Sequence, residues 1–112
     1  MGQTNANFLN GVPELLVLRL LGQREMYGYA LVQEIGRATG QSIVLGEGVI
    51  YPLLHALERD GALRARRQAV DGRSRIYYSL TPAGRERLGR VADDWSRINN
   101  AIARLLAGPA NA

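Results

Sequence analysis

The spacing of apolar residues changes at Gly61, and this change limits what the chain can fold into. Before Gly61, four apolar residues have the i, i+3, i+4, i+7 spacing of an amphipathic helix: Ile50, Leu53, Leu54 and Leu57. After Gly61, apolar and polar residues alternate in two runs, with the favoured turn pair Asp71-Gly72 between them. The sequence therefore predicts a helix that leads directly into a two-stranded β-hairpin.

The hairpin needs helical support, because an isolated pair of strands is only marginally stable in water. We expect its second strand to place three side chains against that support: Ile76, Tyr78 and Leu80. Apolar spacing and end signals predict three more helices, over residues 13–22, 27–39 and 82–107, and Thr81 is the expected N-cap of the last one. An interior proline costs about 3 kcal/mol, so Pro52 indicates that the helix before the hairpin begins near residues 46–48. We expect Phe8 and Leu9 to dock the polar N-terminal stretch on these helices.

The basic charge is concentrated in the predicted hairpin. All fourteen basic residues of the chain are arginines, and the formal net charge is +4. Residues 59–75 hold six arginines and two aspartates, which already gives that net charge of +4. Arginine suits phosphates and guanine edges, so the hairpin is a candidate for nucleic-acid binding. The alternative is a solvated hairpin that is kept basic for solubility.

Composition disfavours an enzyme or a metal protein. The chain has no cysteine and a single histidine, His55, so it lacks a thiolate nucleophile and a cysteine-based zinc site, and we expect no cofactor. The N-terminus shows no targeting signal, and no apolar run approaches the roughly 20 residues of a membrane span. We expect a soluble, cytoplasmic protein of one domain that does not enter a membrane.

Two side chains on the outer face of the helix before the hairpin are suited to contacting DNA. Tyr51 and His55 lie one helical turn apart. A tyrosine can donate to a phosphate or touch a thymine methyl group, and a histidine can donate to a phosphate or a base. Arg73 and Arg75 flank the predicted hairpin tip, where they can reach phosphates or a minor groove. The alternative for His55 is a solvated surface residue.

The predicted C-terminal helix carries a heptad seam. Its apolar residues are spaced 3, 4, 3, 4 and 3 apart: Leu88, Val91, Trp95, Ile98, Ile102 and Leu105. The seam favours a homodimer, although the helix could instead pack only on its own domain. Trp95 is either just the largest seam residue or part of a cleft that stacks a flat aromatic ligand. Gly84 and Gly89 weaken the helix, so we expect them to allow close packing.

Several short stretches, taken in their order and spacing, resemble the PadR family of bacterial transcriptional regulators. They are Tyr27-Gly28-Tyr29, Tyr51-Pro52-Leu53-Leu54, Leu57-Glu58-Arg59-Asp60-Gly61, Asp71-Gly72-Arg73, Tyr77-Tyr78 and Leu80-Thr81-Pro82-Ala83-Gly84. The resemblance runs from about Phe8 to Leu106. The single C-terminal helix, with Asp94-Trp95-Ser96-Arg97, is similar to the compact subgroup that includes multidrug-responsive repressors.

This resemblance implies a mainly α fold with a small β-hairpin. Residues 8–80 would form a winged helix-turn-helix body and residues 81–107 a dimerisation helix, in one domain over 1–112. It implies a homodimeric repressor that binds double-stranded DNA at an inverted repeat and is released by phenolic or drug-like aromatics. The main alternative is a helical protein–protein interaction module that uses the C-terminal seam and does not bind DNA.

The resemblance also implies which residues act. It assigns DNA contacts to Gly48, Tyr51, His55, Arg73 and Arg75. Three further residues complete the set that we expect to bind DNA: Tyr29, Arg59 and Arg66. The space for an aromatic effector would be bordered by Val91, Trp95, Asn99 and Ile102.

Overall fold

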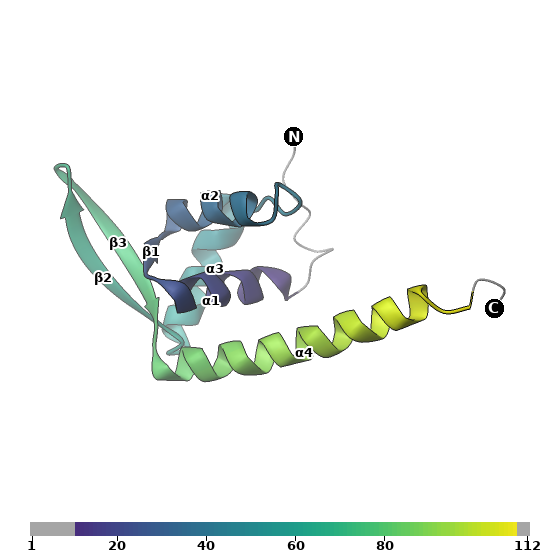
Figure 1. The fold of residues 1–112 in the computed structure, drawn as a ribbon. Coiled ribbons are helices and arrows are strands. Elements are labelled where there is room, and N and C mark those ends of the chain that lie inside the picture. Colours follow the sequence, from purple (N-terminus) through teal and green to yellow (C-terminus); the bar gives the residue numbers. More distant parts are fainter. Residues whose placement is uncertain (1–10, 110–112) are drawn as a thin grey trace.

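The fold consists of a winged-helix body and one long helix that extends beyond it (Figure 1). The computed structural model describes residues 11–109. In chain order the elements are α1 (Val12–Gln23), β1 (Met26–Tyr27), α2 (Gly28–Ala38), α3 (Glu47–Arg59), β2 (Leu63–Val70), β3 (Arg73–Leu80) and α4 (Pro82–Leu106). This mainly α architecture with a small antiparallel sheet confirms the predicted fold class.

Local signals in the sequence account for where these elements begin and end. Helix α3 begins after Gly46, as Pro52 indicated. The side chain of Thr81 caps α4 by accepting a hydrogen bond of 3.0 Å from the amide of Gly84. At the hairpin tip, Asp71 and Gly72 have φ angles of 51° and 77°, the left-handed pair that a tight two-residue turn requires. These predictions are confirmed.

The sheet has a third strand that the sequence analysis missed. Strand β1 pairs antiparallel with β3, through Met26 with Tyr78 and Tyr27 with Tyr77, so the strand order is β1-β3-β2. A strand of two residues is too short to show an alternating pattern. It anchors the inner part of the hairpin beside the start of α2.

The apolar core lies between the three helices of the body and the inner part of the sheet. Several of its side chains are completely buried: Val17, Leu18, Leu31, Ile50 and Leu54. Tyr78 and Leu80 also face this core, as predicted, and are 3% and 6% exposed. The prediction was wrong for Ile76, which is 39% exposed, because the outer part of the hairpin projects beyond the helices (Figure 1).

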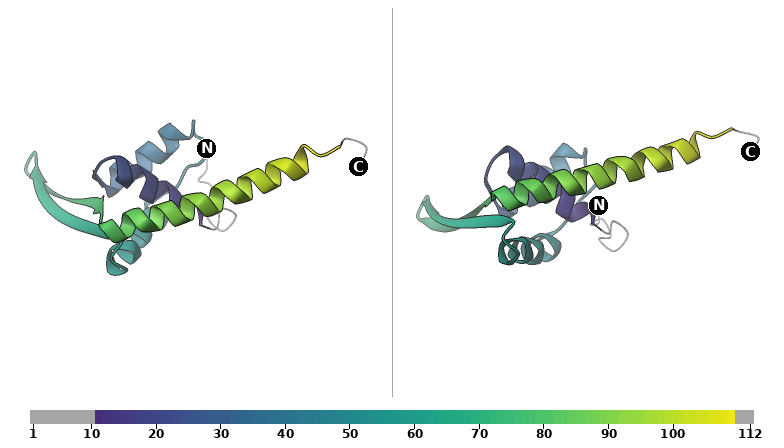
Figure 2. Two further views of the ribbon diagram at one scale, coloured as in Figure 1. Left: turned by 60° about the horizontal axis from the view of Figure 1, so that its bottom comes forward. Right: turned by 90° about the horizontal axis from the view of Figure 1, so that it is seen from below.

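Helix α4 packs along α1 and then continues past it (Figure 2). Two glycines permit a close approach of α4 to the body, Gly22 on the side of α1 and Gly84 on the side of the turn after α3. A Cβ atom on Gly22 would lie 3.2 Å from Leu88, and one on Gly84 would lie 2.1 Å from the carbonyl oxygen of Ala62. Helix α1 ends at Gln23, one residue after the predicted end at Gly22. For Gly84 the close packing is confirmed, whereas within residues 11–109 no atom outside the adjacent helix backbone lies within 4 Å of such a Cβ on Gly89.

The expected docking of Phe8 and Leu9 lies outside the described residues. In the part of the chain that the structure describes, every helix is too short or too polar to span a membrane.

Candidate nucleic-acid interface

Helix α3 presents a narrow exposed face opposite the side that enters the core. Its exposed residues at helical spacing are Gly48, Pro52, His55 and Arg59. The buried side carries Ile50, Leu54 and Leu57, which are at most 1% exposed. Three of these four positions were expected to contact DNA. Pro52, which indicated where the helix begins, was not predicted to lie on this exposed face.

Tyr51 is turned away from this face. Its ring lies against Gly28 at the start of α2, where an added Cβ would be 2.5 Å from the ring. Burial raises the pKa of the Tyr51 hydroxyl, and the negative charge of Glu47 adds to this effect, while a backbone hydrogen bond from Tyr29 opposes it. The half-buried Tyr51 therefore joins α3 to the N-terminus of α2, although the sequence analysis placed it on or near the outer face of the helix.

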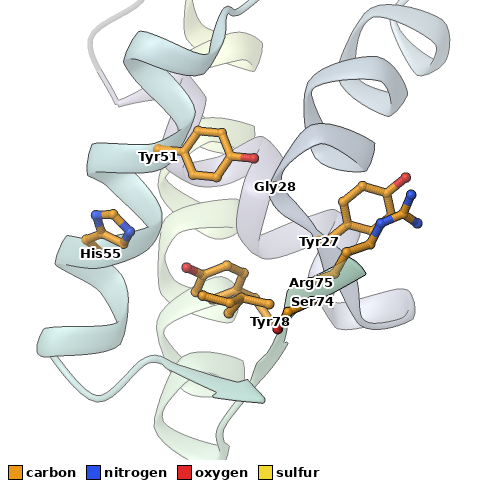
Figure 3. Close-up of a pocket in the computed structure, with 8 residues that line it drawn as sticks. Tyr27, Gly28, Tyr51, His55, Ser74, Arg75 and Tyr78 are labelled. Carbon is orange, nitrogen blue, oxygen red and sulfur yellow. The ribbon is translucent and has the colours of Figure 1, made fainter. Parts of the chain in front are cut away.

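A cleft of about 250 Å³ separates α3 from the wing, which is the hairpin of β2 and β3 (Figure 3). It is lined by Tyr27, Gly28, Tyr51, His55, Ser74, Arg75, Ile76 and Tyr78. The cleft thus brings together Tyr51, His55 and Arg75 from the expected DNA-binding set. Its lining offers an imidazole, hydroxyl groups and tyrosine rings, and the Arg75 guanidinium lies over the Tyr27 ring at the edge of the cleft (Figure 3). Such a set of donors can hold an anionic phosphate oxygen.

Stacked arginine and tyrosine side chains brace the base of the wing. The guanidinium carbon of Arg75 lies 4.4 Å from the ring centre of Tyr27, and that of Arg66 lies 5.2 Å from the ring centre of Tyr77. The two rings meet edge to face, with centres 5.5 Å apart. Cation–π contacts and edge-to-face ring pairs each stabilise a fold by about 0.5–1.5 kcal/mol. Arg75 is therefore held at the edge of the cleft.

Arg66 is also paired with an acid that the sequence analysis missed. Its Nε donates to Oε2 of Glu25 at 3.1 Å, and a second nitrogen binds the other carboxylate oxygen. The hydrogen bond from Arg66 lowers the pKa of the Glu25 carboxyl below its usual value. The two residues are 41 positions apart, so no local pattern could reveal the pair. Glu25 neutralises part of the positive charge that Arg66 was expected to offer to DNA.

Two remaining arginines of the expected set, Arg59 and Arg73, are open to a partner, and so is Arg64, which that set did not include. Within residues 11–109, no ion pair involves Arg59, Arg64 or Arg73, and all three are exposed. Arg73 sits at the wing tip directly after the turn. Tyr29, on the first turn of α2, is 48% exposed. The free positive charge therefore lies at the end of α3 and along the wing.

The four residues expected to border an effector lie on α4, away from the cleft. Val91 and Trp95 are partly covered, and Asn99 and Ile102 are exposed. The Trp95 ring lies beside the start of α1, since a Cβ atom on Gly11 would be 3.8 Å from it. Over the described part of the chain, no three histidine or acidic side chains gather as metal ligands would.

Several known proteins that are similar to this chain are transcriptional regulators. A model of the Transcriptional regulator PadR-like family matches residues 17–90. The Transcriptional regulator Rv3488 of Mycobacterium tuberculosis is 38% identical over 81 residues, which cover 72% of this chain and 73% of that protein.

Solved structures give the same result. The PadR-like transcriptional regulator from Bacillus cereus is 30% identical with a TM-score of 0.80, over 92% of this chain and 99% of that one. The PadR family transcriptional regulator from Eggerthella lenta is 28% identical with a TM-score of 0.79, over 92% and 88% of the two chains.

Proposed function

Because this chain belongs to the PadR-like family of transcriptional regulators, we propose that it is a homodimeric repressor that binds an inverted-repeat operator and is released by a flat aromatic effector. Family membership makes it a transcriptional regulator and not an enzyme. In this proposal the body over residues 8–80 and the dimerisation helix over residues 81–107 form one domain. It acts on double-stranded DNA in the cytoplasm.

The observation that carries the proposal is the continuous surface formed by α3, the cleft and the wing. Helix α3 offers His55 and Arg59 on its exposed face, and the cleft joins that helix to β3. In winged-helix proteins such a helix enters the major groove, and a basic wing contacts the adjacent backbone or minor groove. His55 and Arg59 would then face base edges, the cleft would receive a backbone phosphate, and Arg73 would reach beyond it.

Duplex DNA binding at several salt concentrations tests this surface. We expect an affinity that falls steeply with salt, and Arg73→Ala should reduce the slope of log K against log salt by about 1. Arg104→Ala removes an equal charge at the far end of α4 and should leave the slope unchanged. His55→Ala should alter sequence preference more than salt dependence. Binding that is absent or independent of salt would favour the protein-interaction module.

The dimer is supported by the apolar stripe on the outer half of α4. Ile98 and Ile102 are 47% and 51% exposed, and Leu105 is 81% exposed. A two-fold pairing of this stripe would cover all three at once and place two α3 helices at symmetric half-sites. Sedimentation at micromolar concentration should show a dimer that Ile102→Asp dissociates. A monomeric native chain would contradict both the dimer and the operator symmetry.

The effector proposal depends on Trp95 and its place between the body and that stripe. Its ring is half-covered by the start of α1, so two symmetry-related rings can border a space at the dimer interface. Because the chain has a single tryptophan, its fluorescence reports on this position alone. Planar aromatic compounds should quench it, and the same compounds should weaken DNA binding. A broad panel that leaves the fluorescence unchanged would remove the effector from the proposal.

A further inference from the structure

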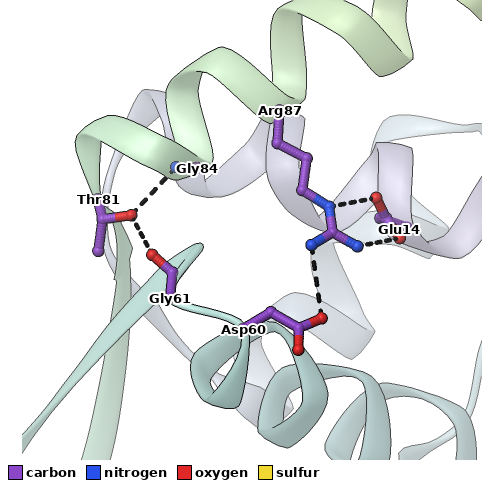
Figure 4. A network of polar contacts seen from close by, with 6 residues as sticks. All are labelled: Glu14, Asp60, Gly61, Thr81, Gly84 and Arg87. Carbon is purple, nitrogen blue, oxygen red and sulfur yellow. Dashed lines mark hydrogen bonds and ion pairs between the residues drawn. The ribbon is translucent and has the colours of Figure 1, made fainter.

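Arg87 of α4 connects α4 to both α1 and α3 (Figure 4). Its Nε donates to Oε2 of Glu14 in α1 at 2.9 Å, and its Nη2 donates to Oε1 at 3.1 Å. Its Nη1 lies 3.6 Å from Oδ2 of Asp60, the residue that ends α3. The side chains of Arg87 and Glu14 are only 29% and 25% exposed. This two-bond fork is therefore better shielded from water than a surface ion pair.

A second connection holds the beginning of α4 to the turn after α3. The Thr81 hydroxyl donates to the carbonyl oxygen of Gly61 at 2.6 Å, and the Thr81 amide donates to that of Ala62 at 3.1 Å. The glycine at position 84 lets the helix approach that same turn. By itself this connection is a pivot, because all of its contacts gather at one end of α4.

Arg87 supplies a second point of attachment farther along the helix. It lies six residues after Thr81, or about 9 Å along the helix axis. The apolar contacts of Leu88 beside Gly22 and of Trp95 beside Gly11 join α4 to α1. Within residues 11–109, the Arg87–Asp60 contact is the ion pair that joins α4 to the end of α3. The apolar contacts hold α4 along α1, and the Arg87–Asp60 pair adds a direct polar restraint on the angle between α4 and α3.

The angle matters because α4 acts as a long lever. At 25 residues the helix is about 37 Å long, so a rotation of about 10° at its start would displace its far end by about 6 Å. In the proposed dimer, the outer half of α4 meets its symmetry mate, while α3 enters DNA. Any change in the angle between the two helices then changes the distance between the two α3 helices, which must match the half-site spacing.

We propose that Arg87, held by Glu14 and bonded to Asp60, is a positioning residue that sets the angle between α3 and α4 and thereby the operator spacing that the dimer accepts. The effect on spacing rests on the proposed function, whereas the effect on the angle does not. Arg87 itself need not contact DNA.

A distance measurement within one chain tests the angle directly. The native chain has no cysteine, so Glu58→Cys on α3 and Asn100→Cys on α4 give two unique spin-label sites, both exposed. Labelled chains are diluted in unlabelled chains, and pulsed electron resonance reports the distance within each labelled chain. We expect one narrow distribution for the native background, and a broadened or shifted one with Arg87→Met. Asp60→Asn should reproduce part of the change, and Arg87→Lys should restore part of it.

The matched control is Arg85→Met, which removes the same charge from an exposed position on the same helix. It should leave the distribution unchanged. Circular dichroism establishes that each variant is folded, and Glu14→Gln and Asp60→Asn replace Arg87→Met if that variant unfolds. An unchanged distribution in all the junction variants, or equal broadening by Arg85→Met, would overturn the proposal.

A DNA experiment then tests the functional consequence. Half-sites selected by the native protein are placed at their preferred spacing and at spacings changed by one or two base pairs. The native protein should bind the preferred spacing more tightly than the altered ones. In the Arg87→Met variant this ratio of affinities should fall about fivefold, the factor expected for a partly exposed ion pair. A uniform loss of affinity at every spacing would contradict the positioning role. Failure of the native protein to bind any duplex would instead count against the proposed function, and the distance measurement would still decide the role of Arg87 in the angle.

Discussion

The winged-helix body buries its apolar residues, whereas the outer half of α4 leaves its apolar residues exposed. In the body, Leu18, Leu31 and Leu54 have no exposed surface, whereas Leu105 and Leu106 on α4 are each 81% exposed. Both regions have regular apolar spacing at the sequence level. The difference teaches that spacing predicts an apolar face, but not which surface covers that face.

This difference in burial matches the different roles that we propose for the two regions, DNA contact for the body and dimerisation for the outer half of α4. The body already has a core from its own chain, so it can hold α3 and the wing in a defined position. The outer half of α4 leaves Ile98 and Ile102 about half exposed. We therefore expect the stability of the body to depend on packing within one chain, and that of the outer helix to depend on a second chain.

The largest effect is expected when a leucine is shortened to alanine in the core, compared with the same substitution on the outer half of α4. The quantity compared is the free energy of unfolding. Leu54→Ala should lower the free energy of unfolding by about 2–5 kcal/mol, because it empties a fully buried site. Leu105→Ala should change it by less than about 0.5 kcal/mol at protein concentrations too low for the proposed dimer to form. Urea unfolding at several protein concentrations measures both changes. A cost for Leu105→Ala that is equal at all concentrations would mean that this leucine packs within its own chain.

An intermediate effect is expected for two glycines in the same helix. Gly84→Ala should cost about 1–3 kcal/mol, because its Cβ would overlap the carbonyl oxygen of Ala62. Gly89→Ala meets open space and should stabilise the monomer by about 1 kcal/mol through helix propensity. Thermal unfolding of both variants gives the comparison. Destabilisation by Gly89→Ala that appears only in concentrated protein would indicate that a second chain packs at this position.

The smallest expected effect concerns a polar pair on the surface of the body. The pKa of the Glu25 carboxyl should lie below its ordinary value, because the hydrogen bond from Arg66 favours the charged carboxylate, and Arg66→Met should raise this pKa again. Because the pKa of Glu25 is lower in the folded chain than in the unfolded chain, the ion pair stabilises the fold at pH values above the unfolded-state pKa. This stabilisation is lost as the pH falls through the folded-state pKa. Carboxyl carbon chemical shifts in an acid titration by nuclear magnetic resonance measure the pKa. A Glu25 pKa that does not respond to Arg66→Met would show that the pair does not form in solution.

Local signals were sufficient for most of the secondary structure. The cap formed by Thr81, the turn pair Asp71-Gly72 and the limit imposed by Pro52 each act within a few residues, and each was found where the sequence predicted it. Strand β1 was missed because its evidence is a pairing with β3, far along the chain. Helix α1 ends at Gln23, one residue after the predicted end at Gly22, and Gly22 itself accommodates a side chain of α4.

The candidate site could be predicted by region but not by orientation. Arginine density pointed to the wing, and helical spacing pointed to one face of α3. The turning of Tyr51 toward α2 depends on the space left by Gly28, and the pairing of Arg66 depends on Glu25. Neither partner belongs to the element that carries the predicted residue. A pattern within one element therefore could not reveal them.

The sequence by itself determined the order of the four helices and the hairpin, the basic character of the wing and the apolar stripe of α4. These features follow from period, capping and charge, which act within an element. Only the tertiary structure decided that Tyr51 enters a cleft and that Arg87 joins α4 to both α1 and α3. The physical reason is that such contacts form between residues far apart in the sequence, and the path of the folded backbone alone brings them within bonding distance.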